Sequence, residues 1–168
     1  FITFMYGRET NDIYYTALLP LKKKDTVKAK CLMMVAAQIG QLLISLPFAF
    51  LRAGLLPGGN PAGIEANVAY YGFGFMVYTV FNVIFLTQFF KTAHKVGASF
   101  LKAIVPAVIG VVIMEVIVHL PGFEWLDSIE LDQMLRQLPI LVVGVVLYIS
   151  GMLFTYHTAA KRFEQVDL

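Results

Sequence analysis

Four long apolar runs, each bounded by polar or turn-forming residues, dominate the chain. They cover about residues 31–51, 67–90, 99–120 and 138–158. An α-helix rises ~1.5 Å per residue, so each run matches the ~30 Å hydrocarbon thickness of a bilayer. The pattern predicts an all-α, polytopic transmembrane helical bundle that forms a single membrane domain over residues 1–168.

The stretch before the first run is polar and contains a proline break. We expect a short cytoplasmic helix over about residues 11–19, with Thr10 or Asn11 as its N-cap and Asp12 in its first turn. Pro20 ends this helix, because the residue before a proline is disfavoured in the α conformation. A second helix is expected to start among the lysines that follow and to continue into the first run.

Shorter segments outside the four runs complete the predicted architecture. Residues 1–7 are apolar but too short to cross a bilayer. We therefore expect them to be the cytoplasmic end of a span whose beginning is missing, and the chain to be the C-terminal part of a longer one. Glycine and proline predict a loop over residues 54–63. A short external amphipathic helix is predicted from the helical spacing of Leu131, Met134, Leu135 and Leu138.

Composition and charge favour a membrane protein and predict its orientation. Hydrophobic residues make up 58% of the chain and charged residues 14%, and the mean hydropathy is +0.73, unlike a soluble domain. The net charge of +2 indicates no nucleic-acid partner, and the lipid bilayer is the expected surroundings. Eleven of the thirteen Lys and Arg residues lie on one side of the predicted spans. The positive-inside rule makes that side cytoplasmic. We therefore expect a multi-pass protein of the cell membrane. Its cytoplasmic segments are predicted at 8–30, 91–98 and 159–168, and its external segments at 53–66 and 121–137.

Two groups of polar residues within the predicted spans are candidates for function. Gln38, Gln41 and Ser45 share one helix face, where they either hydrogen-bond to neighbouring helices or line a substrate path. Glu115 is the only acidic residue inside a span, and His119 follows one turn later. These two form either a structural pair at the outer mouth or a proton or substrate relay.

The motifs in the sequence give no support for an enzyme. The chain contains no Gly-x-x-x-x-Gly-Lys-Ser/Thr loop for phosphate, and its three histidines are not at metal-ligand spacing. Neither a metal nor a cofactor is therefore expected. Gly97-Ala98-Ser99 matches the Gly-x-Ser of an intramembrane serine protease, but it lies at the membrane border beside Lys95 and Lys102 rather than in a sheltered cavity.

The polar stretch before the first span has an informative order of residues. Glu9 and Asn11-Asp12 are followed by Leu18-Leu19-Pro20-Leu21-Lys22-Lys23-Lys24-Asp25-Thr26-Val27-Lys28-Ala29-Lys30. This order resembles the inner loop of ABC-2 type transporter permeases, in which a small acidic-aromatic helix leads into Leu-Pro, basic residues, an acid, Val and a Lys before a span. The ending Lys161-Arg162-Phe163-Glu164-Gln165-Val166-Asp167-Leu168 is also similar to the family's. Lys22 departs from the pattern, because members usually have Ser or Thr there as a helix cap.

The resemblance implies a six-span permease of which this chain lacks the first span and most of the second. It further implies a transport subunit that does not hydrolyse ATP, paired with a separate cytoplasmic ABC ATPase and with a second permease copy or homologue. The helix at about 11–19 would dock on the ATPase. The expected contact residues are Glu9, Asp12, Ile13, Tyr14, Tyr15, Leu18, Leu19 and Pro20. Two other classes fit the spans: a non-transporting membrane scaffold or accessory protein and, less well, an intramembrane protease.

Overall fold

The computed structural model describes residues 1–55 and 63–166, and its regular structure over those residues is entirely helical. The elements in chain order are α1 (Ile2–Glu9), α2 (Asp12–Ala17), α3 (Lys23–Leu55), α4 (Val68–Thr92), α5 (Val96–Val118), the 3₁₀ turn η1 (Glu124–Leu126) and α6 (Leu131–Glu164). By length and composition, α3, α4, α5 and α6 can each cross a membrane. The predicted helical membrane bundle is confirmed.

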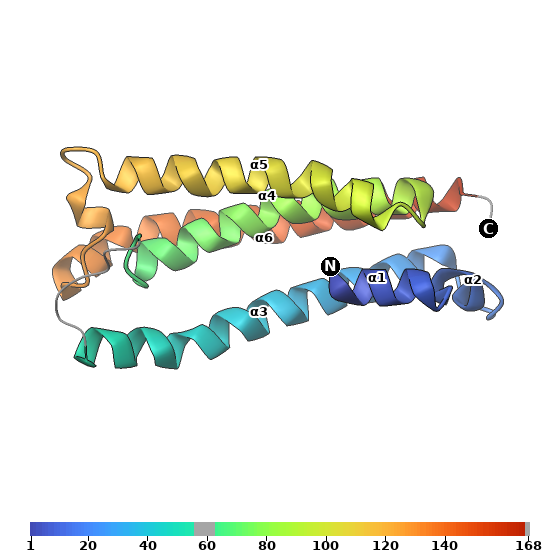
Figure 1. Cartoon of the computed structure of the whole chain (residues 1–168), viewed down its shortest axis with the longest axis horizontal. Helices are drawn as coiled ribbons and strands as arrows, with labels where there is room; N and C mark the ends of the chain where they lie inside the picture. Colours follow the sequence, from blue (N-terminus) through green and yellow to red (C-terminus); the bar gives the residue numbers. More distant parts are fainter. Residues whose placement is uncertain (56–62, 167–168) are drawn as a thin grey trace.

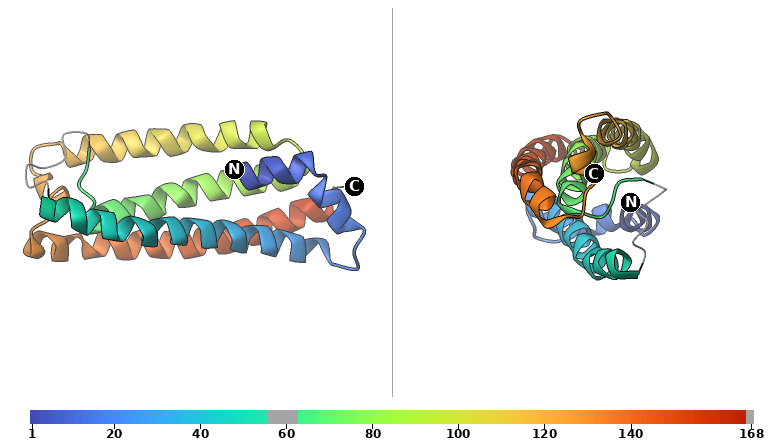
Figure 2. Two further views of the ribbon diagram at one scale, coloured as in Figure 1. Left: turned by 60° about the horizontal axis from the view of Figure 1, so that its bottom comes forward. Right: turned by 90° about the vertical axis from the view of Figure 1, so that its left-hand side faces the viewer.

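The four long helices run side by side along the length of the molecule, with α3 at one edge and α5 at the other (Figure 1). The views in Figure 2 show α4 in the interior, and it packs against α5 and α6. The short helices α1 and α2 fold together at one end. We call this the basic end, because it gathers Arg8, Lys22, Lys23, Lys24, Lys28, Lys30, Lys91, Lys95, Lys161 and Arg162. The opposite, acidic end holds Glu65, Glu115, Glu124, Asp127, Glu130 and Asp132.

Helix boundaries differ from the predicted ones mainly at the two ends of the bundle. As predicted, α3 starts among the lysines and continues through the first apolar run. The predicted external amphipathic helix is not a separate element, because its residues form the first turns of α6, which continues through Pro139. Apolar residues at helical spacing on both sides of that proline allow one helix to serve both roles. The predicted loop over 54–63 falls largely on residues 56–62, outside the described residues.

A cluster of aromatic side chains forms the core at the basic end. Phe4 of α1 meets the rings of Phe85 and Phe89 edge-on, with centroids 5.0 and 4.9 Å apart. Phe90 of α4 contacts Phe163 of α6 in the same way, at 5.2 Å. Offset and edge-to-face aromatic pairs of this kind each contribute ~0.5–1.5 kcal/mol beyond the area they bury. This core fixes α1 and the end of α6 against α4.

Glycines allow α4 and α6 to approach closely in the half of the bundle nearer the acidic end. A methyl group on Gly72 would lie 2.8 Å from the backbone of Ile140 and Leu141, and one on Gly144 would lie 3.0 Å from the carbonyl carbon of Gly72. Both distances are shorter than ordinary van der Waals contact, so only glycine fits. In lipid, the hydrophobic effect does not drive helices together. Small residues at such crossings let the backbones pack closely, and this van der Waals contact stabilises the helix pair.

Hydrogen bonds from two buried amide side chains close the acidic end. Gln137 of α6 accepts from the Ala69 N–H at 3.1 Å and donates to the carbonyls of Trp125 and Ser128 at 2.8 and 3.0 Å. Asn67 donates to Leu126 O at 2.8 Å and caps α4 by accepting from the Tyr70 N–H. These bonds satisfy backbone groups that helix ends leave unpaired.

Candidate functional site

The candidate site is the α1–α2 hairpin at the basic end. The chain reverses between the two helices at Asn11, which has a left-handed backbone conformation. Asn11 has φ +53° and ψ +33°, a conformation that asparagine tolerates better than most residues. Its side chain does not bond to the helix N–H groups, and the Thr10 hydroxyl donates backwards to Tyr6 O at 2.9 Å. The expected side-chain N-cap is therefore wrong, because the turn uses both residues to end α1 instead.

One side of α2 is fixed to the bundle. Ile13 is only 7% exposed and belongs to the aromatic core with Phe4 and Phe89. Asp12 forms an ion pair with Lys30 of α3, whose ammonium also lies 5.7 Å from the centre of the Phe4 ring. The Asp12 carboxylate lies beside Gly7, where a side chain would come within 3.3 Å of it. Two of the predicted partner-binding residues, Asp12 and Ile13, thus bind α2 to its own chain.

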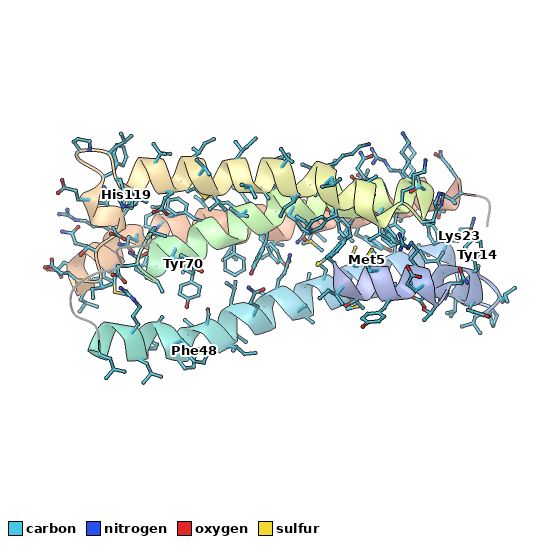
Figure 3. All side chains as sticks on the ribbon, viewed as in Figure 1. Met5, Tyr14, Lys23, Phe48, Tyr70 and His119 are labelled. Carbon is cyan, nitrogen blue, oxygen red and sulfur yellow. The ribbon has the colours of Figure 1, made fainter. Side chains whose placement is uncertain are left out.

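The other side of α2 and the turn after it expose large apolar groups. Leu18 is 81% exposed and Tyr15 67%, and Tyr14 and Leu19 are each at least half exposed. The helix ends at Ala17, three residues before the proline that was expected to end it. The remaining predicted contact residues, Glu9 and Pro20, are also exposed. Six of the eight predicted residues are therefore exposed, and Figure 3 shows Tyr14 at this end of the molecule near Lys23.

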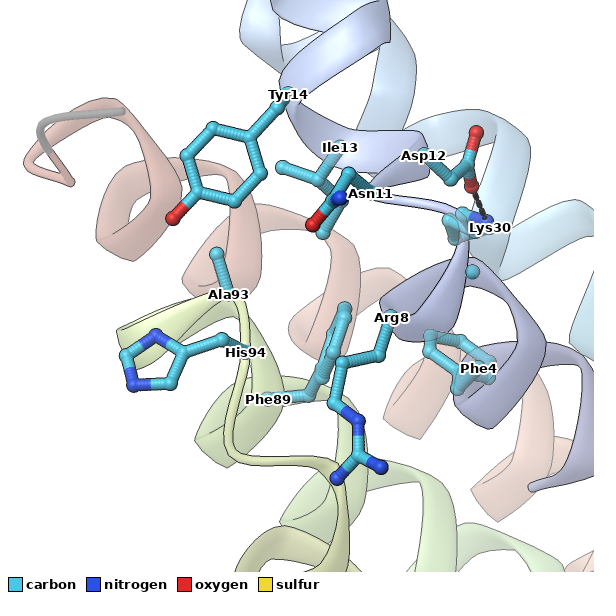
Figure 4. Close-up of a pocket in the computed structure, with 11 residues that line it drawn as sticks. Phe4, Arg8, Asn11, Asp12, Ile13, Tyr14, Lys30, Phe89, Ala93 and His94 are labelled. Carbon is cyan, nitrogen blue, oxygen red and sulfur yellow. Dashed lines mark hydrogen bonds and ion pairs between the residues drawn. The ribbon is translucent and has the colours of Figure 1, made fainter.

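A pocket of about 50 Å³ lies between the hairpin and the turn that joins α4 to α5. In Figure 4, Tyr14 and Ile13 come from α2, Phe4 and Arg8 from α1, and Ala93 and His94 from the α4–α5 turn. Sequence reasoning did not link Phe89, Ala93 or His94 to the hairpin, because no sequence spacing connects them to it. Ala93, with φ +64°, ends α4 in a left-handed conformation.

The start of α3 is tied to the ends of α4 and α6. Lys23 donates to Val166 O at 2.6 Å and lies 5.8 Å from the centre of the Phe163 ring. Arg162 of α6 donates to Thr87 O of α4 at 2.7 Å. These bonds join three long helices directly behind the hairpin.

The polar residues of α3 separate into buried and exposed ones. Gln38 and Asn82 exchange two hydrogen bonds at 2.9 and 2.8 Å, and Tyr148 of α6 donates to Gln38 at 2.7 Å. Ser45 lies 3.1 Å from the Tyr71 hydroxyl, whereas Gln41 is exposed. Sequence reasoning missed Asn82 and Tyr148, although an asparagine in an apolar run was a usable signal.

An apolar cleft of about 530 Å³ separates the second half of α3 from α4 and α6. Leu42 and Leu46 of α3, Tyr71 and Phe75 of α4, and Leu141 of α6 line it, together with further apolar residues. Neither Gln38 nor Gln41 lines this cleft. Gln38 therefore joins helices in this structure rather than facing a cleft.

The pair predicted at the outer mouth forms at the acidic end. His119 Nδ1 lies 3.7 Å from Glu115 Oε1 and 2.8 Å from the Glu115 carbonyl oxygen, and both side chains are exposed. Glu115 also accepts from the Ile64 N–H at 3.4 Å. A second ion pair, between Arg52 and Glu65, joins the end of α3 to the segment before α4.

The serine of the protease-like motif lacks the surroundings of a nucleophile. Ser99 is buried and its hydroxyl donates to Lys95 O at 2.9 Å, within its own helix. Within residues 1–55 and 63–166, no group of three or more His, Cys, Asp or Glu side chains is arranged to hold a metal ion.

Comparison with protein families gives a match over most of the chain. The family profile described as ABC-2 family transporter protein matches residues 1–159. No curated protein and no solved structure matches the chain. The match covers the hairpin, α3, α4, α5 and most of α6, and so this chain belongs to the ABC-2 family of transporter proteins, as a membrane permease.

Proposed function

We propose that this chain is the permease subunit of an ABC transporter, moving a substrate across the cell membrane with ATP that a separate cytoplasmic ATPase hydrolyses. The basic end faces the cytoplasm in this proposal. Lysines and arginines gathered at one end of a helical bundle support that orientation. A second copy of the chain, or a homologue, completes the pore.

The observation that carries the proposal is the exposed apolar surface of α2 and the turn after it. The basic end must lie in water, because its charged lysines are hydrated. Four large side chains are exposed there: Tyr14, Tyr15, Leu18 and Leu19. Apolar side chains grouped on a wet surface are typical of a partner site. Tyrosine is also among the residues that contribute most to binding energy at interfaces. We infer that this surface docks on the ATPase.

The fixed side of α2 provides a route for motion into the bundle. A force on α2 acts on α3 through the Asp12–Lys30 ion pair and on α4 through the contact of Ile13 with the aromatic core. Because α3 continues as one helix from Lys23 to Leu55, displacement at its start is carried along a rigid rod. Docking and transmission thus use opposite sides of one short helix.

The test is the double variant Tyr14→Ala/Leu18→Ala in the intact transporter. Interface anchors typically cost ~2 kcal/mol or more when truncated, which is roughly a thirtyfold loss of affinity. Copurification of the ATPase and transport-coupled ATP hydrolysis should both fall. Since both side chains are exposed, the melting temperature of the membrane part should not change.

A matched control removes one tyrosine and one leucine at the acidic end. Tyr70 and Leu135 are also exposed, and Tyr70→Ala/Leu135→Ala should leave ATPase copurification unchanged. Equal copurification of the ATPase with the Tyr14/Leu18 variant and the wild type would refute the docking surface. If no ATPase copurified with the wild type, a membrane scaffold or accessory role would replace the proposal.

A further inference from the structure

A second groove opens between α3 and α6 near the basic end. Its volume is about 420 Å³, and it shares no lining residue with the apolar cleft at the other end of α3. The lining residues are Lys28, Cys31, Leu32 and Val35 of α3 and Tyr148, Ile149, Met152, Leu153 and Tyr156 of α6. Nothing in the transport proposal uses this groove.

The groove combines an apolar wall with one charge at its end. Among the residues that the structure describes, Lys28 is the only charged one that lines the groove, and Lys24 lies one helical turn earlier on the same face of α3. Lys28 is exposed, and no ion pair joins it to an acidic residue in the described part of the chain. Asp25 and Glu164, the acidic residues nearest to it along α3 and at the end of α6, are exposed and likewise make no ion pair there.

The depth of these residues matches the layers of a bilayer leaflet. Lys28 precedes the first predicted span by three residues, so its ammonium lies at headgroup level. At ~1.5 Å per residue, Leu32 and Val35 lie about 6 and 10 Å deeper along α3. The apolar wall therefore begins where acyl chains begin. Tyr156, which also lines the groove, carries a phenol that can donate a hydrogen bond.

We propose that this groove binds one anionic phospholipid from the leaflet at the basic end. The phosphate pairs with Lys28, and an acyl chain lies along Leu32, Val35 and Leu153. Basic pockets between transmembrane helices are suited to anionic headgroups, and a zwitterionic lipid gains less because its own cation offsets the attraction. The proposal depends on the membrane placement of α3 and α6 and not on the ATPase partnership.

The experiment is native mass spectrometry of the intact protein with phosphatidylglycerol and phosphatidylcholine added in equal amounts. The wild type should retain phosphatidylglycerol in preference. Lys28→Ala should weaken its binding about fivefold, which corresponds to ~1 kcal/mol for one lysine near the surface. Leu153→Trp, which fills the groove without changing charge, should also reduce retention of phosphatidylglycerol.

Two control variants separate a site from general attraction to a basic surface. Lys95 is an exposed lysine at the same end, in the α4–α5 turn, and Lys95→Ala should have no effect. Val146 is as exposed as Leu153 on the same helix but does not line the groove, so Val146→Trp should bind lipid normally. Equal retention of the two lipids by the wild type, equal losses in Lys28→Ala and Lys95→Ala, or normal binding by Leu153→Trp would each overturn the site.

Discussion

The closest contact between two long helices provides a quantitative test of the bundle. A methyl group added at Gly72 of α4 would lie 2.8 Å from three backbone atoms of α6, whereas ordinary contact begins at 3.4 Å. The helices must therefore separate by about 0.6 Å, because backbone atoms cannot rotate away. Overpacking of this kind costs ~1–3 kcal/mol, and we expect the upper part of that range. Replacing a helical glycine by alanine gains back ~0.5–1 kcal/mol, so Gly72→Ala should be destabilised by about 2 kcal/mol.

Gly74, two residues further along the same helix, is the matched control. In the described part of the chain, no heavy atom beyond the adjoining residues and backbone of its own helix lies within 4 Å of a methyl group placed there. Gly74→Ala should therefore be as stable as the wild type or up to ~1 kcal/mol more stable. The measurement is the free energy of unfolding in detergent micelles, from a titration with a denaturing detergent followed by circular dichroism. The difference between the variants isolates the steric cost, which should be about 3 kcal/mol. Equal stability of Gly72→Ala and Gly74→Ala would show that α4 and α6 are not in this contact.

Two further predictions concern the polar contacts of α3. Within the described residues, replacing Gln38 by leucine leaves Asn82 with only the Met152 sulfur as a partner and removes the acceptor of the Tyr148 hydroxyl. The free energy of unfolding should fall by ~1–3 kcal/mol. The double variant with Asn82→Leu should then lose less than the sum of the single changes, and strict additivity in the same titration would argue against the bond. Replacing Lys30 by methionine removes the ion pair with Asp12, which is only partly screened because the Lys30 side chain is 16% exposed and the Asp12 side chain 39%. For Lys30→Met we expect a stability loss of about 1 kcal/mol, normal ATPase copurification and weaker transport-coupled ATP hydrolysis. The exchanged pair Asp12→Lys/Lys30→Asp should recover the hydrolysis. Normal transport-coupled hydrolysis in Lys30→Met would refute the transmission route.

The positions of the four long helices follow from the sequence alone. A run of about 20 apolar residues in lipid must satisfy every backbone group internally, which makes it a helix whatever its neighbours are. The start of α3 among the lysines belongs to the same class of local inference. The family resemblance, which rests on the order of residues from Glu9 to Lys30, is likewise confirmed by the profile match.

Only the tertiary structure decided which side chains meet. Helical spacing placed Gln38, Gln41 and Ser45 on one face but could not assign Asn82 and Tyr148 as partners of Gln38, because those contacts depend on how three helices cross. The exposure of Gln41 also depends on how the helices pack, so helical spacing could not predict it.

At the hairpin and at the start of α6, the structure also differs from what local rules predicted. Thr10 or Asn11 was expected to cap α2, but Asn11 adopts a left-handed conformation, while Ile13 reaches the core and Asp12 pairs with Lys30. The predicted surface helix is instead the first part of α6, where Gln137 bonds to the neighbouring loop and to α4. The local pattern of apolar residues is enough to specify a helix in lipid. Side-chain contacts between helices depend on how the helices are placed relative to one another, which the sequence of one segment does not specify.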